Sequence, residues 1–282
     1  MSRATTPRAP TSRAPTTAAV PARPPRPRTV APGHDPVDTA VDEACRILHL
    51  PTIRDGYDEA AERALREHSS YKEFLADLLG TEVNQRDERR KLRLVREANF
   101  PRPKRIEDFD YTANPGVAAE QVNTLTDGAW VAAGLPLCLI GDSGTGKSHL
   151  LIGIGTAVAE AGYRVRYTTA ANLVNELAEA ADDRQLTRVI ARYGRVDLLC
   201  LDEFGYLDLD KAGSKLLFQI FTDREERRSM AVASNAPFSE WQKTFTDPRL
   251  CNAVVDRLTF KAHIIETGTE SYRLLSTTNE HA

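Results

Sequence analysis

Long apolar runs and closely spaced cysteines are both missing from this chain of 282 residues. No apolar run approaches the ~20 residues that a membrane-spanning helix needs, and the N-terminus lacks the apolar segment of a signal peptide. The four cysteines lie far apart, and no pair has the C-x-x-C spacing of a zinc or redox site. Cys138 and Cys200 fall inside apolar, strand-like runs, which is typical of buried, reduced thiols. We therefore expect a cytoplasmic protein without a membrane partner.

Acidic and large apolar side chains are almost absent from residues 1–37. This segment is rich in Pro, Ala, Thr and Arg, with six arginines and no acidic residue before Asp35. Such a composition cannot offset the entropy cost of ordering, so we predict a disordered basic tail. The tail would either neutralise nucleic-acid phosphates or remain a solvated segment without a specific role. Residues 276–282 are expected to form a short, flexible C-terminus.

Helical periodicity begins after this tail and predicts a small all-helical domain over residues 38–100. Ser70, followed three residues later by Glu73, resembles a capping box that opens one helix of this domain. A separate and highly charged helix is expected over residues 82–98. Prolines then break the helix, and residues 101–115 are interpreted as a linker.

The charged helix carries a local excess of basic side chains that the net charge of −3 hides. Between residues 86 and 105, nine basic residues face three acidic ones. One interpretation is a solvated helical face with ion pairs between residues four apart. The other is a surface that contacts the phosphates of double-stranded DNA. The residues that would make these DNA contacts are Arg86, Arg89, Arg90, Lys91, Arg93 and Arg96.

Strands and helices alternate over residues 116–275, where we place the second domain. Apolar strand-like runs are followed by helical stretches, a pattern that predicts a parallel sheet with helices on both faces. The fold class is therefore α/β, with a five-stranded parallel sheet and ligand chemistry at the carboxyl ends of the strands. The expected strands are 135–140, 164–168, 196–201, 230–234 and 262–266, and helices are expected at 116–130, 170–179, 185–193, 211–227 and 248–258.

A glycine-rich loop after the first strand fits the phosphate-binding pattern G-x-x-x-x-G-K-[ST]. The glycines let backbone N–H groups converge, and the helix that follows offers its positive N-terminus to a polyphosphate. Lys147 would reach the β- and γ-phosphates of ATP, and the hydroxyl of Ser148 would bind Mg²⁺. A flexible Gly/Ser turn is the alternative. The predicted nucleotide contacts are Gly141, Asp142, Ser143, Gly144, Thr145, Gly146, Lys147, Ser148 and His149.

Polar side chains follow two further strands. Asp202 and Glu203 end the third, where Asp202 would order the metal's water ligands and Glu203 would orient or deprotonate the attacking water. Asn235 ends the fourth and would hold that water or contact the γ-phosphate, although such residues also commonly begin turns. The aromatic stretch 106–111 would either line an adenine pocket or pack against the next helix. These residues and the glycine-rich loop indicate a site for ATP hydrolysis with Mg²⁺.

Five segments of the chain occur in the order and spacing of the IstB-like transposition helper ATPases. They are 141–148, 201–207, 234–241, 255–258 and 270–273. The chain resembles this family over about residues 41–275, and the family belongs to the AAA+ relatives of the DnaC/DnaI helicase loaders. The resemblance implies a P-loop ATPase core of the AAA+ type, a homo-oligomeric ring or filament, and a partner transposase. About sixteen residues follow the last strand, so a full C-terminal lid is not expected.

The resemblance also implies roles for three side chains. Asn235 matches the first sensor of the family. Arg257 matches an arginine finger that acts on the ATP of the neighbouring subunit, unless it forms a surface ion pair with Asp256 or Glu266. Arg273 falls where a second sensor arginine would lie, although a surface arginine near a terminus is a comparable alternative.

The sequence thus predicts a DNA-stimulated, Mg²⁺-dependent ATPase that oligomerises on DNA and helps a transposase to select or remodel its target. A replicative helicase loader with the same motor is the main alternative. A small-molecule kinase would need neither the acidic pair nor Asn235, and it would not need an arginine from another subunit. A DNA-binding adaptor that does not hydrolyse ATP is opposed by the complete set of catalytic residues.

Overall fold

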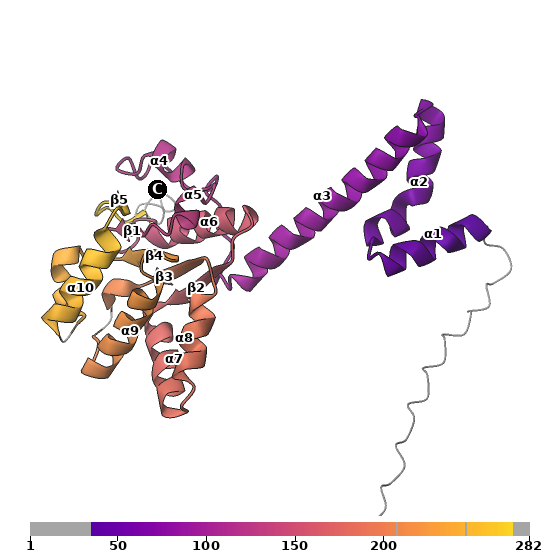
Figure 1. The fold of residues 1–282 in the computed structure, drawn as a ribbon. Helices are drawn as coiled ribbons and strands as arrows, with labels where there is room; N and C mark the ends of the chain where they lie inside the picture. The colour runs from indigo at the N-terminus through magenta and orange to yellow at the C-terminus, as the bar shows by residue number, and fades with distance from the viewer. Residues whose placement is uncertain (1–34, 207, 246, 273–282) are drawn as a thin grey trace, which may run out of the picture.

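The computed structural model describes residues 35–206, 208–245 and 247–272, and Figure 1 shows two units joined by a long helix. Apart from residues 35–37, the basic tail predicted for residues 1–37 lies outside these ranges. The C-terminus predicted for residues 276–282 lies outside them too. In the described ranges, no helix combines the length and the apolar character needed to cross a membrane.

Three helices form the N-terminal unit: α1 (Pro36–Ile47), α2 (Pro51–Glu67) and α3 (Tyr71–Glu97). The predicted capping box is confirmed, because Glu73 N–H donates to Ser70 Oγ over 3.3 Å and Ser70 N–H donates to Glu73 Oε2 over 2.7 Å. The prediction of a separate charged helix from residue 82 is wrong, since α3 is one helix of 27 residues. Gly80 lies inside α3 at a cost of about 1 kcal/mol, which is too small to break a helix that packs against α2 and α6.

A buried carboxylate of α3 holds the corner at the start of α2. Leu50, the residue before α2, carries no polar side chain that would cap this helix. Glu82 Oε2 instead accepts hydrogen bonds from Thr52 N–H at 2.8 Å and Ile53 N–H at 3.2 Å, and Arg86 donates to Oε1 at 3.1 Å. Burial opposes the ionisation of Glu82, but these hydrogen bonds outweigh it and hold its pKa below the usual value. The carboxylate therefore fixes α2 against α3.

A five-stranded parallel sheet forms the centre of the second unit, as predicted. The strands are β1 (Leu137–Ile140), β2 (Val165–Thr169), β3 (Leu198–Asp202), β4 (Ser229–Ser234) and β5 (His263–Glu266). Their order in the sheet is β2-β3-β4-β1-β5. The register places Ile140 beside Ser234 and Thr169 beside Asp202, so the carboxyl ends of the strands meet at one edge. The predicted bounds of each strand are within two residues of these.

Helices cover both faces of the sheet (Figure 1). They are α4 (Ala119–Asn123), α5 (Ala129–Ala132), α6 (Lys147–Glu160), α7 (Ala170–Asp182), α8 (Leu186–Gly194), α9 (Lys211–Arg224) and α10 (Pro248–Thr259). The single helix predicted for residues 116–130 is wrong, because that segment holds α4 and only the start of α5. Gly128, which directly precedes α5, has φ 75°, a left-handed conformation that interrupts a right-handed helix.

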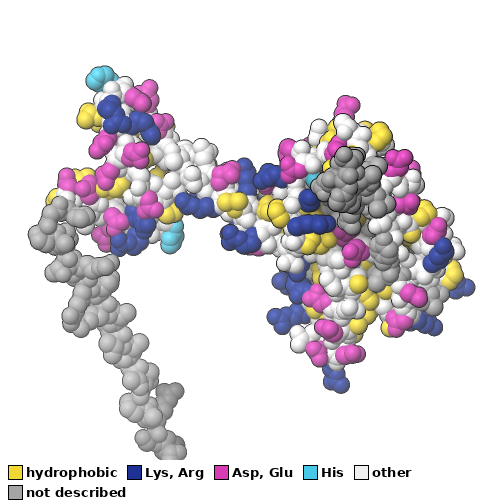
Figure 2. Space-filling model, turned by 180° about the vertical axis from the view of Figure 1, so that it is seen from behind, with side chains coloured by type: hydrophobic (Ala, Val, Ile, Leu, Met, Phe, Trp, Pro, Cys, Tyr) yellow, Lys and Arg dark blue, Asp and Glu magenta, His cyan; other side chains and the backbone are white. Residues whose placement is uncertain are grey.

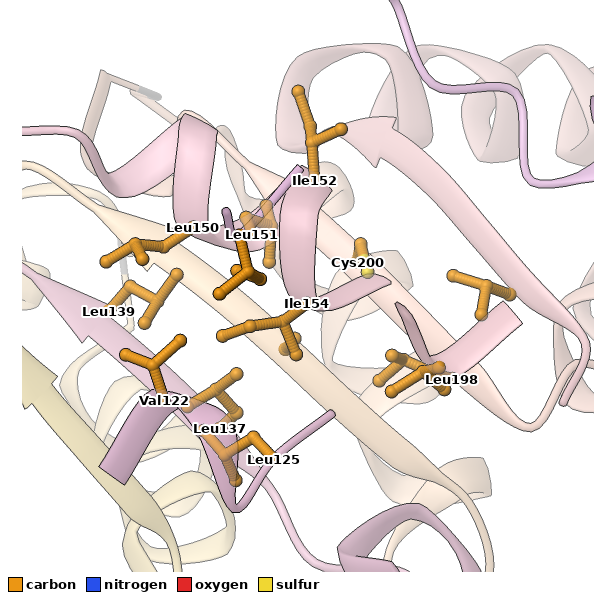
Figure 3. Close-up of a cluster of buried hydrophobic side chains, with 14 of the residues drawn as sticks. Val122, Leu125, Leu137, Leu139, Leu150, Leu151, Ile152, Ile154, Leu198 and Cys200 are labelled. Atoms are coloured by element: carbon orange, nitrogen blue, oxygen red, sulfur yellow. The ribbon is translucent and has the colours of Figure 1, made fainter. Parts of the chain in front are cut away.

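Two apolar clusters lie on opposite faces of the sheet, because side chains alternate along each strand. The first contains Leu137 and Leu139 with residues of α3, α4 and α6, and part of it is shown in Figure 3. The second contains Cys138 with residues of α7, α8, α9 and α10. Cys138 and Cys200 are buried, free thiols, as predicted, and burial raises the pKa of Cys138 to about 12.

The segment 101–115, interpreted above as a linker, packs closely against the sheet unit. Ile106 and Phe109 are buried in the first apolar cluster. The end of α3 is also tied to the sheet, because Tyr167 N–H in β2 donates to Ala98 O over 2.8 Å. The helical unit is therefore anchored through the C-terminal end of α3, while a domain boundary near residue 100 stays a prediction.

A buried arginine joins the segments that enter β3 and β4. Arg224, which is 1% exposed, lies in the last turn of α9. Its guanidinium donates to the carbonyl groups of Tyr193, Val196, Asp197 and Ser229 over 2.5–3.3 Å. Burial lowers the pKa of Arg224 to about 10, so the guanidinium remains charged at neutral pH.

The Arg224→Met variant is expected to lose about 3 kcal/mol or more in the free energy of unfolding, because each buried carbonyl group left without a donor costs about 1–3 kcal/mol. Urea unfolding followed by circular dichroism measures this loss. Arg227→Met, which changes an exposed arginine nearby, is the matched control and should remain within about 0.5 kcal/mol of the wild type. Equal stability of the Arg224→Met variant and the wild type would contradict the role given to this side chain.

Candidate nucleotide-binding site

The glycine-rich loop lies between β1 and α6, at the carboxyl edge of the sheet. The hydroxyl groups of Thr145 and Thr267 lie 2.6 Å apart and anchor the loop to the residue after β5. Gly146 has φ 91°, and a Cβ atom at this position would lie 2.6 Å from Phe109 Cε2. Both the backbone and this contact therefore require glycine, and α6 starts directly after it with its N-terminus at the loop.

Lys147 is the first residue of α6, and its side chain folds over the loop. It is 8% exposed, and its ammonium group donates to Asp142 O over 2.5 Å and to Thr145 Oγ1 over 3.4 Å. Buried ammonium groups need such acceptors because burying an unpaired charge is costly. Phosphate oxygens form stronger, charge-assisted bonds, so Lys147 is placed to exchange loop contacts for those of a nucleotide.

Asp202 and Glu203 differ sharply in their surroundings. Asp202 ends β3 and is 4% exposed, and both of its carboxylate oxygens accept hydrogen bonds. Tyr167 O–H donates to Oδ2 over 2.8 Å, and Glu203 N–H donates to Oδ1 over 2.9 Å. Burial and the neighbouring Asp202 charge raise the pKa of Tyr167, so its hydroxyl stays protonated and remains a donor. Glu203 is exposed and has φ 58°, a left-handed backbone conformation that is uncommon outside glycine.

Asn235 follows β4 and faces the same region. The turn after β4 is stabilised by Ser234, whose Oγ accepts from Ala236 N–H over 3.1 Å and from Trp241 Nε1–H over 3.1 Å. Asn235 Oδ1 is buried and has no hydrogen-bond partner among the described residues. An orphaned buried oxygen is costly without a partner, so its presence beside the loop fits a site that a ligand completes.

These side chains meet around one cavity of about 550 Å³. The predicted site residues that line it are Ser143, Gly144, Gly146, Lys147, Ser148, His149, Asp202, Glu203 and Asn235. Gly141, Asp142 and Thr145 complete the loop that forms part of its wall, and Arg273 lies outside the described residues. The cavity is also lined by Arg102, Lys104 and Asn114, which no motif had marked. The basic charge of Arg102 and Lys104 was counted with that of the charged helix as a possible DNA surface, because charge alone does not show which surface a side chain faces.

The aromatic stretch 106–111 packs against the glycine-rich loop and also lines this cavity. Phe109 is buried against Gly146, and its ring lies edge-on to that of His149 with centroids 5.4 Å apart. His149 Nε2 lies 2.8 Å from Arg105 O, so this histidine joins α6 to the segment 101–115. Burial lowers the pKa of His149, which favours a neutral ring at neutral pH. Phe109 therefore packs against the loop and also lines the cavity, while adenine binding by this stretch stays a prediction.

The oxygen donors at the cavity suit Mg²⁺. Ser148 and Asp202, the predicted metal residues, both line it. In residues 35–206, 208–245 and 247–272, no group of three or more His, Cys, Asp or Glu side chains is placed to hold a metal ion. Mg²⁺ is usually held by one or two carboxylates together with the phosphates of a substrate. The residues present therefore fit a metal ion that arrives with a nucleotide.

Arg257 lies away from this cavity. It is in the last turn of α10 and lines a different cavity of about 310 Å³ together with Glu225. Its Nε donates to Glu225 Oε2 over 2.7 Å, and its guanidinium lies 5.0 Å from the centre of the Phe218 ring. Arg257 does form an ion pair, but the predicted partners Asp256 and Glu266 are wrong. The partner is Glu225, which directly follows α9. A role of Arg257 on its own subunit's nucleotide is not compatible with this position.

The six basic residues predicted to contact DNA are not equivalent in the structure. Five of them, Arg86, Arg89, Arg90, Arg93 and Arg96, are exposed, and at 100° per residue they share one side of α3. Lys91 lies on the other side, is half-buried and donates to Glu88 over 2.8 Å. Arg86 donates to His49 O over 2.6 Å and Arg89 to Thr52 Oγ1 over 2.9 Å, so both also stabilise the corner between α1 and α2.

The fold and the cavity together define a class of protein. A phosphate loop after β1, a carboxylate pair at the end of β3 and an amide after β4 surround one cavity at the carboxyl edge of a five-stranded parallel sheet. This is the arrangement of a P-loop nucleotide-binding protein of the AAA+ type. The family model described as "IstB-like ATP binding protein" matches residues 44–280, and the chain belongs to this family. The resemblance inferred from the sequence is confirmed, which argues against a small-molecule kinase.

Relatives from two bacteria are similar over most of their length. An insertion sequence ATP-binding protein of Sinorhizobium fredii is 39% identical over 243 residues, which cover 84% of this chain and 82% of that protein. The ATP-binding protein of insertion sequence IS5376 from Geobacillus stearothermophilus is 33% identical over 234 residues, which cover 83% and 93%.

Two solved structures share the fold over about two thirds of this chain. AMPPCP-bound DnaA from Aquifex aeolicus has a TM-score of 0.52 at 21% identity, over 65% of this chain and 57% of that one. DnaI has a TM-score of 0.50 at 20% identity, over 62% of this chain and 92% of that one. At these identities the likeness establishes the fold alone.

Proposed function

We propose that the protein is a helper ATPase of insertion-sequence transposition, which hydrolyses ATP with Mg²⁺ and oligomerises on double-stranded DNA. It would select or remodel the target and recruit or stimulate a partner transposase in the cytoplasm. The meeting of Lys147, Asp202, Glu203 and Asn235 at one cavity carries this proposal. A helicase loader would share the motor, but the two relatives are named for insertion sequences, which favours the transposition helper.

Each side chain at the cavity has a defined task in this proposal. Lys147 and the N–H groups of the loop bind the β- and γ-phosphates, while Ser148 and Asp202 hold the metal ion. Mg²⁺ would neutralise charge on the phosphates when it is bound. Glu203 accepts a proton from the attacking water, and Asn235 orients that water against the γ-phosphate.

The position of Arg257 is compatible with the proposed oligomerisation. Because it lies away from its own cavity, its guanidinium would act on the ATP of a neighbouring subunit, after leaving Glu225. The ion pair with Glu225 is partly exposed to water, so its net energy is small and a phosphate can replace the carboxylate as the partner of Arg257. ATP would then be bound between two subunits of a ring or filament.

The arginine side of α3 is the proposed DNA surface. Figure 2 shows Lys and Arg side chains along the narrow connection between the two units, where α3 runs. Arg90, Arg93 and Arg96 are exposed there, beyond the corner that Arg86 and Arg89 stabilise. A row of guanidinium groups on one side of a helix suits the phosphates of a duplex.

The test combines DNA binding with ATP turnover. Duplex DNA should stimulate ATP hydrolysis by the wild type, and electron microscopy with a non-hydrolysable ATP analogue should show ordered oligomers on DNA. The Arg90→Gln/Arg93→Gln double variant should bind duplex more weakly. Its plot of log affinity against log salt concentration should lose a slope of about 2, because each lost phosphate contact removes about 1.

The matched control changes two exposed arginines of α2 in the same helical unit. Arg63→Gln/Arg66→Gln alters the net charge equally and should keep the wild-type salt slope. If both double variants lost affinity equally, total charge and not the α3 surface would explain DNA binding. DNA-independent turnover by a monomeric wild type would overturn the proposed function itself.

A further inference from the structure

Tyr167 connects the buried carboxylate of the cavity to the base of the helical unit. Its hydroxyl donates to Asp202 Oδ2 over 2.8 Å, while Glu203 N–H donates to the other oxygen. Two donors fix the rotation of this carboxylate, and its position decides where a metal ligand or a metal-bound water can lie. Tyr167 therefore acts on the metal residue without lining the phosphate loop itself.

The backbone and ring of the same tyrosine contact the end of α3. Tyr167 N–H donates to Ala98 O over 2.8 Å, and Ala98 is the fully buried residue that directly follows α3. The ring of Phe100 lies near that of Tyr167, with centroids 6.0 Å apart. A movement of the end of α3 would thus displace the residue that orients Asp202.

A second cavity lies along this connection. It measures about 660 Å³ and is lined by Phe100 and Tyr167 as well as by Ser148, Asp202 and Glu203. The last three residues also line the nucleotide cavity. The tyrosine thus lies between the junction of the two units and the catalytic carboxylates, beside open space in which side chains can rearrange.

We propose that Tyr167 is a positioning residue that orients Asp202 for the metal ion and links the state of the nucleotide site to the placement of α3. The inference rests on the proposed function, in which Asp202 serves a Mg²⁺ ion. Coupling of this kind is reciprocal: if the metal–nucleotide complex changes the affinity for DNA by some factor, then DNA changes the affinity for that complex by the same factor. DNA bound to α3 would act on ATP hydrolysis through this residue.

The test measures metal affinity directly, apart from activity. Full-length protein is loaded with a non-hydrolysable ATP analogue and titrated with Mn²⁺, whose free ion is followed by electron paramagnetic resonance. Tyr167→Phe keeps the ring and removes the hydroxyl, and it should weaken Mn²⁺ binding about 10–100-fold, as loss of a hydrogen bond to a metal ligand does. Binding of the analogue without metal should remain at the wild-type level.

The control is Tyr163→Phe, which removes a hydroxyl from a tyrosine packed against the same apolar cluster. It should leave Mn²⁺ affinity unchanged. Equal Mn²⁺ affinity of the Tyr167→Phe variant and the wild type would overturn the inference and leave the nucleotide site intact. Failure of the wild type to bind the analogue would instead overturn the proposed function.

A second measurement needs no variant. In the wild type, Mn²⁺ with the analogue should change hydrogen exchange of residues 94–100, at the end of α3, relative to the analogue alone. Unchanged exchange in this segment would contradict the link between the metal residue and α3, whatever the Tyr167→Phe variant does.

Discussion

The Glu203→Gln variant should bind ATP as the wild type does and hydrolyse it about 10²–10⁴ times more slowly, the usual contribution of a positioned general base. Glutamine keeps the size of the side chain and its hydrogen bonding, but it cannot accept a proton from water. The left-handed backbone of Glu203 sets the residue at the mouth of the cavity beside Asp202. Turnover is followed by phosphate release, and ATP affinity by equilibrium binding of a fluorescent analogue.

Glu226 offers a matched control for this substitution. It is an exposed glutamate with φ 55°, close to the φ of Glu203, but it lines the cavity near Arg257. Glu226→Gln should therefore keep the wild-type rate. Wild-type turnover by the Glu203→Gln variant would remove Glu203 from the catalytic assignment.

Replacing Arg257 by alanine should lower the turnover of ATP by about 10³–10⁵-fold relative to the wild type, which is the contribution of an arginine finger to phosphoryl transfer. Binding of ATP should be retained, because Arg257 lies away from the cavity of its own subunit. Arg257→Ala and Lys147→Ala proteins should each be inactive alone. Mixed together they should recover activity, since some interfaces then pair an intact phosphate loop with an intact Arg257.

The ion pair with Glu225 provides the control for a structural role of Arg257. Glu225→Gln breaks the pair within the subunit but leaves the guanidinium in place, so turnover should stay near the wild-type rate. An equal loss in the Glu225→Gln and Arg257→Ala variants, with no recovery on mixing, would mean that Arg257 only stabilises its own subunit.

Local patterns predicted the sheet and the phosphate loop well because both depend on residues close in sequence. Apolar runs mark the strands, and the carboxylates after β3 and the amide after β4 are polar residues that end such runs. In a parallel sheet these ends meet at one edge, so the sequence alone predicted that Lys147, Asp202 and Asn235 lie close together.

Contacts between distant segments were not predictable in the same way. Tyr167 in a strand looks like any apolar core residue until Asp202 is found beside its hydroxyl. Arg224 looks like a surface residue at the end of a helix, because the carbonyl groups it binds come from other segments. The continuity of α3 was missed because Gly80, a weak helix former, lies just before the predicted start of the charged helix at residue 82, while the packing that outweighs its low helix propensity is tertiary.

The continuous helix α3 has a mechanical consequence. Its 27 residues span about 40 Å, so a tilt of about 5° at the Ala98 end would carry Tyr71 through about 3.5 Å. Such a lever turns a sub-ångström adjustment beside Asp202 into a displacement comparable to the axial rise per phosphate of one DNA strand, about 3.4 Å. Under the proposed function, this displacement at the far end of α3 would move the DNA surface of each subunit with the state of its nucleotide site.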